Sequence, residues 1–364
     1  MLTPKHVLLF TPLAEELKRR GFETLLTARD FRETVGLLKI KGVKAEVLGK
    51  YGGGSLEAKL KASLERAMLL AELLSEEKPI LSVSHGSPEA ARVAFGLKIP
   101  HISINDSPHA EAVARLTVPF SMLLLTPFSI PFKAWMRYCI SRSRIKRYKS
   151  LDPLAWIKRR KFTLNTVERL GLNPEKPLII VRPEEVYASY LLEAGKNSLT
   201  LKVLEEILSR VSGKVQLVVL PRYEEQRKIL SERFGGEVFL VDRVLEASDL
   251  LRFCWIFVGG GGTMTTEAVL LGVPSFSYFP GKPTYTEKFL IRKGLITRIT
   301  EADKLARKVH QTLTKIGRVK AEQQRKAQRL ISKLEDPVRF MANVIADAAY
   351  ASEAQPRKAY RRLS

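Results

Sequence analysis

Residues 255–274 read WIFVGGGGTMTTEAVLLGVP. The apolar run before the glycines is typical of a strand, and the residues after them form a helical pattern that a glycine and a proline end. Glycines let the backbone turn tightly and bring its N–H groups close to a ligand, and the N-terminus of the following helix adds partial positive charge. This strand, loop and helix predict a phosphate site at Gly260, Gly261, Gly262 and Thr263.

The one carboxylate of this stretch is Glu267, which lies one turn after Thr263 on the same helix face. It would oppose a phosphate, but it suits the hydroxyls of a ribose farther along. The spacing of the glycines matches neither the P-loop nor the G-x-G-x-x-G fingerprint. An ordinary glycine-rich turn is therefore the alternative interpretation, and the rest of the chain has to decide.

Length and composition set the class of the protein. A chain of 364 residues predicts two domains, and 45% hydrophobic with 27% charged residues is ordinary for a soluble protein. We see neither a membrane-spanning stretch nor a signal peptide, and we expect a cytoplasmic location. The two cysteines, Cys139 and Cys254, are too few for a disulfide framework or a cysteine zinc site, and no metal is expected.

The net charge of +23 calls for an anionic partner. Nucleic acid, an anionic lipid surface and a phosphorylated substrate all meet this requirement. Charge alone does not choose among them.

Strands and helices alternate along both halves of the chain, which indicates parallel sheets. In the second half, Arg182 and Arg222 each follow an apolar run, and Asp242 follows a third. Ligands of such sheets bind beyond the carboxyl ends of the strands, and arginine forks bind phosphate oxygens well. We therefore expect both arginines on the same rim as the glycine loop.

The first half opens directly on a helix signal, with Thr3 as a candidate N-cap and Pro4 at the first helical position. A doubly wound sheet would need a strand before Thr3. We therefore expect either that this sequence starts within a longer chain or that the first strand is missing. His6 lies in the first turn of this helix, where N–H donors gather; a surface histidine is the alternative.

Two later strands of the first half deliver His85, Asp106 and His109 to one predicted rim. Asp106 and His109 are three residues apart at a junction between loop and helix, so each could reach the other, as a base and its orienting group must. The alternative is that Asp106 caps the next helix and His109 is partly exposed.

The most basic region runs from Lys133 to Lys161, with eleven Lys or Arg and a single acid. Aromatic residues are interleaved with the cations, a combination that suits an anionic membrane surface or single-stranded nucleic acid. A solvated linker face is the alternative. The residues that we expect at such a surface are Trp135, Arg142, Arg144, Lys146 and Arg147.

Six segments are specific as a set: Thr3-Pro4-Lys5-His6-Val7, Thr27-Ala28-Arg29-Asp30, Gly86-Ser87-Pro88, Asn105-Asp106-Ser107-Pro108-His109-Ala110, Leu220-Pro221-Arg222 and Gly260 to Gly272. Together they resemble an uncharacterised, mainly archaeal family of the GT-B superfamily. That family is related to UDP-N-acetylglucosamine 2-epimerases and to the N-acetylglucosaminyltransferase of peptidoglycan synthesis. The resemblance spans nearly the whole chain.

The resemblance implies an α/β GT-B fold with two Rossmann-like domains and a cleft between them. The composition turns to that of a linker near Leu172 and Asn173, where a second series of strands and helices starts. We therefore expect an acceptor-side domain at residues 1–172, a nucleotide-sugar domain at 173–335, and a returning helix with a basic tail at 336–364.

Carried over by position, the resemblance also implies roles for single residues. Gly260 to Thr263 would hold the donor diphosphate, and Glu267 the ribose hydroxyls. Asp242 to Leu245 would face the base, and the segment with Gly281 and Thr284 would approach the sugar. His6 resembles a histidine near the N-terminal glycine loop of the peptidoglycan enzyme.

Departures from the epimerase pattern favour transfer over epimerisation. The epimerases resembled have an aspartate where this chain has Ser87, and a His-Arg pair where it has Val181-Arg182. We therefore predict a metal-independent glycosyltransferase without a cofactor. It would take a nucleotide-sugar donor, most simply UDP-linked, and an acceptor at the inner membrane surface. The alternatives are a nucleotide-sugar epimerase and a non-enzymatic protein that binds nucleic acid or membrane.

Overall fold

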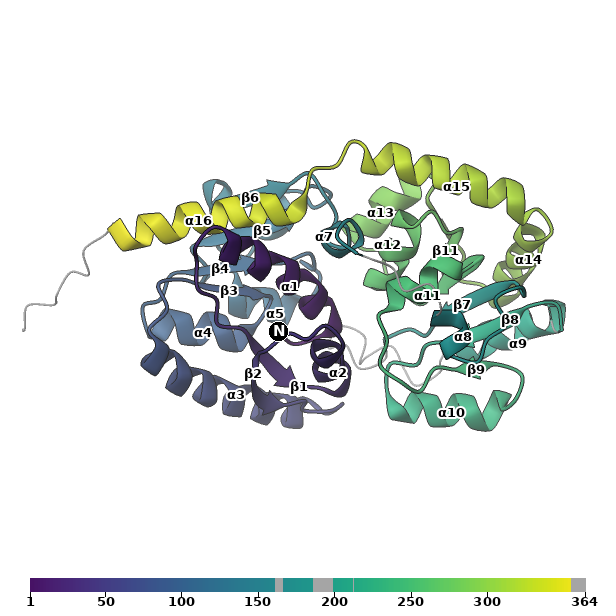
Figure 1. Cartoon of the computed structure of the whole chain (residues 1–364), viewed down its shortest axis with the longest axis horizontal. Coiled ribbons are helices and arrows are strands. Elements are labelled where there is room, and N and C mark those ends of the chain that lie inside the picture. The colour runs from purple at the N-terminus through teal and green to yellow at the C-terminus, as the bar shows by residue number, and fades with distance from the viewer. Residues whose placement is uncertain (161–165, 186–198, 212, 355–364) are drawn as a thin grey trace, which may run out of the picture. The chain divides into compact units, whose positions relative to one another are not determined.

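The structure, a computed structural model, describes residues 1–160, 166–185, 199–211 and 213–354. It divides into two compact units, the first made of residues 1–150 and the chain from Glu335 onward, the second of residues 151–334 (Figure 1). The boundary at 150/151 precedes the predicted one at 172/173. The reason is that Val167, Leu170 and Leu172 pack into a core of the second unit.

Within the described residues, the second unit is built on a six-stranded parallel sheet with the strand order β12-β11-β10-β7-β8-β9. The strands are β7 (Leu178–Arg182), β8 (Gln216–Val219), β9 (Phe239–Leu240), β10 (Ile256–Gly259), β11 (Ser275–Ser277) and β12 (Ile296–Arg298). Read from β9, this order runs 3-2-1-4-5-6, the order of a dinucleotide-binding α/β fold.

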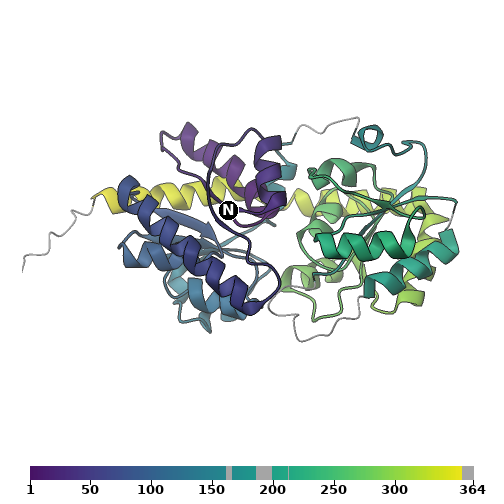
Figure 2. The same cartoon turned by 90° about the horizontal axis from the view of Figure 1, so that it is seen from below.

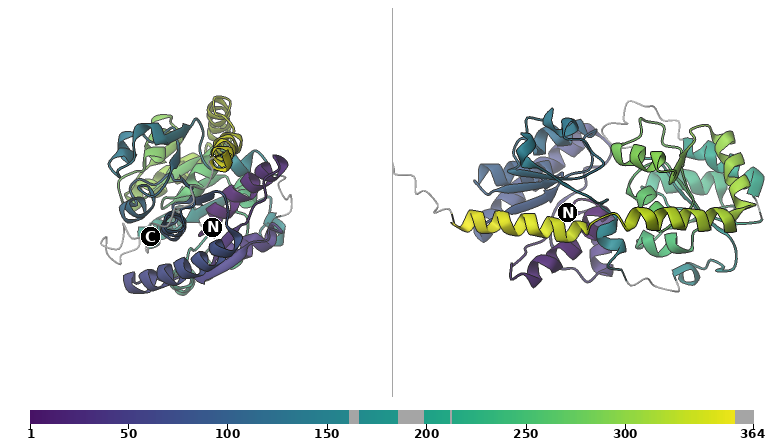
Figure 3. Two further views of the ribbon diagram at one scale, coloured as in Figure 1. Left: turned by 90° about the vertical axis from the view of Figure 1, so that its left-hand side faces the viewer. Right: turned by 90° about the horizontal axis from the view of Figure 1, so that it is seen from above.

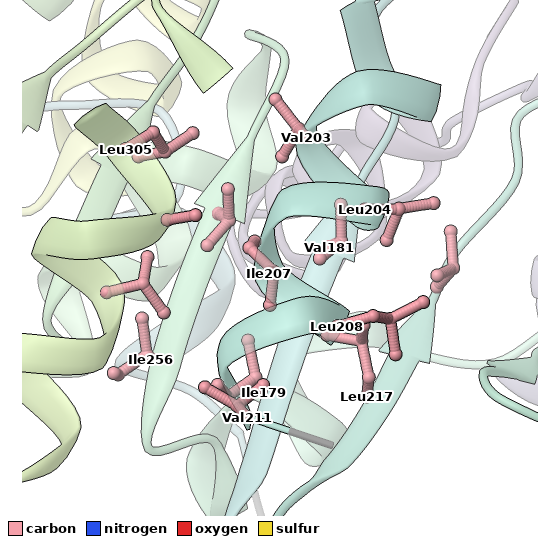
Figure 4. Close-up of a cluster of buried hydrophobic side chains, with 14 of the residues drawn as sticks. Ile179, Val181, Val203, Leu204, Ile207, Leu208, Val211, Leu217, Ile256 and Leu305 are labelled. Carbon is pink, nitrogen blue, oxygen red and sulfur yellow. The ribbon is translucent and has the colours of Figure 1, made fainter. Parts of the chain in front are cut away.

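Both faces of this sheet are covered, which explains its nearly continuous apolar strands. In β7, Ile179 and Val181 face one core, and Leu178 and Ile180 face the other. Figure 4 shows the first core, where the amphipathic helix α9 (Leu199–Val211) and α14 (Ala302–Leu313) pack on the sheet.

The remaining helices of the second unit connect or flank its strands. They are α7 (Leu154–Ile157), α8 (Thr166–Arg169), α10 (Glu224–Phe234), α11 (Ala247–Phe253), α12 (Thr263–Leu270), α13 (Tyr285–Arg292) and α15 (Ile316–Ile331). The helix α12 is the one predicted after the glycine loop.

In its described part, the first unit contains a parallel pair, β1-β2, and a four-stranded parallel sheet, β3-β4-β5-β6. The strands are β1 (Thr27–Asp30), β2 (Glu46–Lys50), β3 (Ser82–His85), β4 (His101–Ile104), β5 (Leu123–Pro127) and β6 (Ile145–Tyr148). Met1 pairs with β1, because its amino group donates to the Thr27 carbonyl and its own carbonyl accepts from the Arg29 N–H.

The helices of the first unit are α1 (Pro4–Arg19), α2 (Arg32–Ile40), α3 (Leu56–Glu77), α4 (Pro88–Gly96), α5 (Glu111–Thr117), α6 (Lys133–Met136), a 3-10 turn (Arg142–Arg144) and α16 (Pro337–Ala354). Figure 2 shows α3 and α4, which pack side by side. The C-terminal helix α16 packs on α1 and β6 (Figure 3). Among the described helices, none has the length and apolar character needed to cross a bilayer.

Candidate functional site

The glycine loop lies where the strand order of the second unit reverses. β7 and β10 are neighbours, yet the chain continues from β7 to β8 on one side and from β10 to β11 on the other. The Gly260 N–H donates to the Arg182 carbonyl at 2.8 Å, so the loop begins directly beside the end of β7. In open α/β sheets, ligands bind beyond the carboxyl ends of the strands at such a reversal.

The loop admits no larger residues at its centre. A Cβ on Gly260 would lie 2.5 Å from the Glu184 nitrogen and 2.6 Å from its Cα, so the backbone itself would have to move. Gly261 and Gly262 have φ angles of +99° and +100°, which side chains rarely adopt. A Cβ on Gly262 would have the guanidinium nitrogens of Arg222 as its nearest atoms within 4 Å.

Two predicted arginines hold this rim together. Arg222 donates from Nε to the Pro183 carbonyl and from Nη2 to the Gly261 carbonyl, both at 2.9 Å. Arg182 donates to the carbonyls of Leu220 and Pro221, at 2.7 and 2.9 Å. The structure therefore brings Arg222 to the glycine loop at the start of α12, while Arg182 braces the end of β8.

Glu267 lies in α12 but is turned inward. The residue is 4% exposed, and its carboxylate accepts a hydrogen bond of 2.8 Å from the Ser248 hydroxyl in α11. Burial raises the pKa of Glu267 to about 7, and the Ser248 hydrogen bond opposes that rise. A ribose would have to compete with Ser248 for this carboxylate.

Sequence reasoning missed a buried polar cluster beside the loop. Glu184 accepts hydrogen bonds from the N–H and the hydroxyl of Thr200, at the start of α9. The Thr200 hydroxyl also lies 2.8 Å from the Tyr278 hydroxyl, and burial raises the pKa of Tyr278 well above its usual range. A signal was present in the sequence, because Glu184 stands two residues after Arg182, at the same strand end.

The other residues predicted to contact the nucleotide-sugar donor lie at loops of the same unit. Asp242 is exposed and contacts Arg243. Thr284 caps α13 by accepting from the Glu287 N–H at 3.2 Å, and the Gly281 carbonyl accepts from Arg298 at 3.0 Å.

A second polar cluster lies in the first unit, at the ends of β3 and β4. The Lys5 ammonium contacts one oxygen of Asp106 at 2.6 Å, and the Ser107 hydroxyl donates to the other at 2.9 Å. His85, the last residue of β3, lies 3.9 Å from Asp106, and its ring centroid is 4.6 Å from that of His6. Lys5 was not predicted, although its position in the first turn of α1 beside His6 was visible in the sequence.

Two histidines of this cluster, His6 and His109, have lowered pKa values, which favours their neutral form. Burial lowers the pKa of His6 well below its usual range, and the neighbouring His85, N-terminus and Lys5 lower it further. The Leu2 N–H donates to His6 Nδ1 at 3.0 Å, which leaves the proton of the neutral ring on Nε2. Burial also lowers the pKa of His109, while the charge of Asp106 opposes this effect.

The prediction that Trp135 lies at a membrane-facing surface is wrong. Trp135 is fully buried, and its indole N–H donates to the Thr126 hydroxyl at 3.0 Å. The aromatic residues interleaved with the cations, Tyr138, Tyr148 and Trp156, are buried as well. They form the core, so they cannot anchor the protein in a lipid headgroup layer.

The cations of this region have mixed surroundings. Arg144 donates to the Met122 carbonyl, and Arg147 to the Phe128 carbonyl. The guanidinium groups of Arg142 and Arg147 lie 4.7 and 4.8 Å from the centroid of the Phe132 ring. Lys146 is exposed on β6. Lys161 lies outside the described residues.

Comparison with known sequences gives one family and one curated relative. The family model described as "Protein of unknown function (DUF354)" matches residues 2–350. The uncharacterized protein MJ0665 of Methanocaldococcus jannaschii is 29% identical over 326 residues, which cover 85% of this chain and 89% of that protein.

Solved structures share the fold at low sequence identity. UDP-GlcNAc 2-epimerase of Neisseria meningitidis, bound to UDP-GlcNAc, has a TM-score of 0.71 and 16% identity, with 96% of this chain and 98% of that chain covered. The M. jannaschii UDP-GlcNAc 2-epimerase, in complex with UDP-GlcNAc and UDP, has a TM-score of 0.68 and 16% identity over 85% and 90%. The spinosyn forosaminyltransferase SpnP has a TM-score of 0.59 and 15% identity over 95% and 98%. The prediction of a GT-B fold with two Rossmann-like domains is confirmed.

Proposed function

We propose a function for this chain, which belongs to the family of proteins of unknown function DUF354. The protein would bind a nucleotide-sugar at the second unit and move the sugar to a hydroxyl acceptor. The observation that carries the proposal is the glycine loop at the strand-order reversal, with the Arg222 guanidinium 3.3 Å from the Cβ position of Gly262.

The donor diphosphate would lie against the loop of residues 260–263, on the N–H groups of residues 261–263, because the Gly260 N–H already donates to the Arg182 carbonyl. Arg222 and the N-terminus of α12 supply positive charge there, so leaving-group charge could be stabilised without a cation. By the same proposal, Glu267 meets the ribose hydroxyls, the segment from Asp242 the base, and Gly281 and Thr284 the sugar.

The acceptor chemistry would belong to the first unit. Asp106 is held by Lys5 and Ser107 and would take the proton of the acceptor hydroxyl as the sugar leaves. His109, kept neutral by burial, is the other candidate proton acceptor. His6 would act as a donor from Nε2, because its Nδ1 already accepts from the Leu2 N–H. The exposed cations Arg142 and Lys146 suit an anionic acceptor, including one at a membrane surface.

Epimerisation of a nucleotide-sugar is the second candidate function. It is favoured by the higher TM-scores to the epimerases, 0.71 and 0.68, than to the transferase SpnP, 0.59. Against it stands Ser87, which occupies the position of an epimerase aspartate and serves as the N-cap of α4, accepting from the Ala90 N–H.

The first experiment is a thermal-shift panel with UDP-, GDP-, ADP- and CDP-sugars on the wild type, Arg222→Ala and Arg233→Ala. Arg233 is the matched control, because it is exposed on α10 and paired with Glu205. A ligand at 100 times its Kd adds about 2.7 kcal/mol, which raises Tm by several degrees. We expect a shift with one nucleotide class, lost in Arg222→Ala and kept in the control. If no nucleotide-sugar raises the Tm of the wild type, the proposal is wrong. Turnover of the donor without any acceptor would favour the epimerase.

A further inference from the structure

An apolar stripe runs along the outside of α3. Leu56, Leu60, Leu64 and Met68 are 68%, 61%, 58% and 66% exposed. They recur every fourth residue, so they share one face of the helix over about 18 Å. Four large apolar side chains in a row on a surface indicate an interaction site rather than scattered exposure.

The opposite face of α3 is already used. It packs on α4 and β2, where the buried Arg66 donates to the carbonyls of Ala28 and Leu48. Figure 2 shows α3 at the periphery of its unit. Within the described part of the first unit, no residue covers the stripe, since its four side chains keep more than half of their surface exposed.

The charges on α3 argue against an anionic membrane. Apart from the buried Arg66, the helix carries two lysines and five glutamates, in a chain whose net charge is +23. A bilayer with anionic headgroups would attract almost any other part of this protein more strongly. The acidic bias instead lowers the repulsion that two strongly basic chains would otherwise feel.

We propose that α3 pairs with α3 of a second copy of this chain, antiparallel, with the two-fold axis at the level of residue 63. In this register residue i of one copy lies opposite residue 126 − i of the other. The four apolar side chains of each copy then alternate along the pair, about 3 Å apart in height. Each central leucine lies between two apolar side chains of the partner.

The same register matches charges. Lys61 and Glu65 lie on one flank of the stripe, both exposed. Because 61 and 65 add to 126, Lys61 of each copy lies opposite Glu65 of the other, which forms two symmetric ion pairs. In a dimer with two-fold symmetry, the same patch of both subunits forms the interface, so the patch must be complementary to itself. The helix α3 fulfils this condition in both its apolar side chains and its charges.

The association state tests the proposal, independently of any nucleotide or sugar. We expect sedimentation equilibrium to give twice the chain mass of 41.0 kDa for the wild type. Leu60→Glu/Leu64→Glu should be a monomer. The control is Ile229→Glu, because Ile229 is also apolar and is 51% exposed on α10. This variant should stay a dimer. Circular dichroism of each variant confirms folding.

Charge exchange tests the register. Lys61→Glu and Glu65→Lys should each weaken the dimer several-fold, and the double exchange should restore it, because both ion pairs re-form with reversed sign. A monomeric wild type overturns the proposal. So does a dimer that survives Leu60→Glu/Leu64→Glu. Binding to vesicles that contain anionic lipid, abolished by the same two substitutions, would also overturn it.

Discussion

Replacing Glu267 by Gln should remove a pH dependence of stability. Glu267 is 4% exposed, and burial raises its pKa from 4.5 to about 7 against the opposing hydrogen bond from Ser248. In the unfolded chain the carboxyl loses its proton at its ordinary pKa. In the folded chain the same carboxyl keeps its proton until the pH reaches about 7.

The sign and size follow from this difference. The folded state binds the proton more tightly, so the contribution is fully present below the unfolded pKa and is lost as the pH rises through the folded pKa. At about 1.4 kcal/mol per pKa unit, the wild type loses about 3 kcal/mol of unfolding free energy from this group. Glutamine cannot ionise, so the variant does not lose it.

The assay is urea unfolding of both proteins at about pH 5 and about pH 8. The difference in unfolding free energy between Glu267→Gln and the wild type should move by about 2.5 kcal/mol in favour of the variant at the higher pH, because a small part of the loss has already occurred at about pH 5. Glu232→Gln, at an exposed position of α10, is the control and should follow the wild type. If this difference is the same at the two pH values, the pKa of Glu267 is not raised in the folded protein and the reasoning is wrong.

Three further predictions address the loop, the first-unit cluster and the core. Gly260→Ala should lower the unfolding free energy by about 1–3 kcal/mol, because its Cβ would meet backbone atoms at 2.5 Å; Gly317→Ala, with nothing within 4 Å, should not, and urea unfolding compares them. Lys5→Met should lower kcat of the proposed transfer about 10- to 100-fold and leave the Kd for the donor unchanged, because Asp106 loses the contact that orients it; equal losses in both would contradict this role. Trp135→Phe should cost about 2–4 kcal/mol of stability and leave vesicle binding unchanged, since it removes the hydrogen bond to Thr126 and part of a fully buried ring; vesicle release would restore the membrane interpretation.

The catalytic-type cluster of the first unit was only partly predictable. Asp106 and His109 stand close in the sequence, and the end of a strand placed them on a rim. The partner of Asp106 is Lys5, which is 101 residues away along the chain. Only the packing of α1 against the ends of β3 and β4 brings the two charges to 2.6 Å.

The basic region shows why composition misleads. Alternating cations and aromatic residues describe a membrane surface and an edge strand equally well. In β6, Ile145 and Tyr148 are buried and Lys146 is exposed, so the aromatic residue faces the core and the lysine faces water. The strand was missed because its cations hid a short apolar pattern.

The sequence by itself determined the local elements whose signals lie within a few residues: the strand before Gly259, the glycine loop, the helix from Thr263, and the alternation that implies parallel sheets. Tertiary structure alone decided which side of each element is buried, that Glu267 turns to Ser248, and that Lys5 meets Asp106. The physical reason is range. Backbone preference and turn chemistry act between neighbours in sequence, whereas burial and ion pairing depend on which distant segments the packed core brings together.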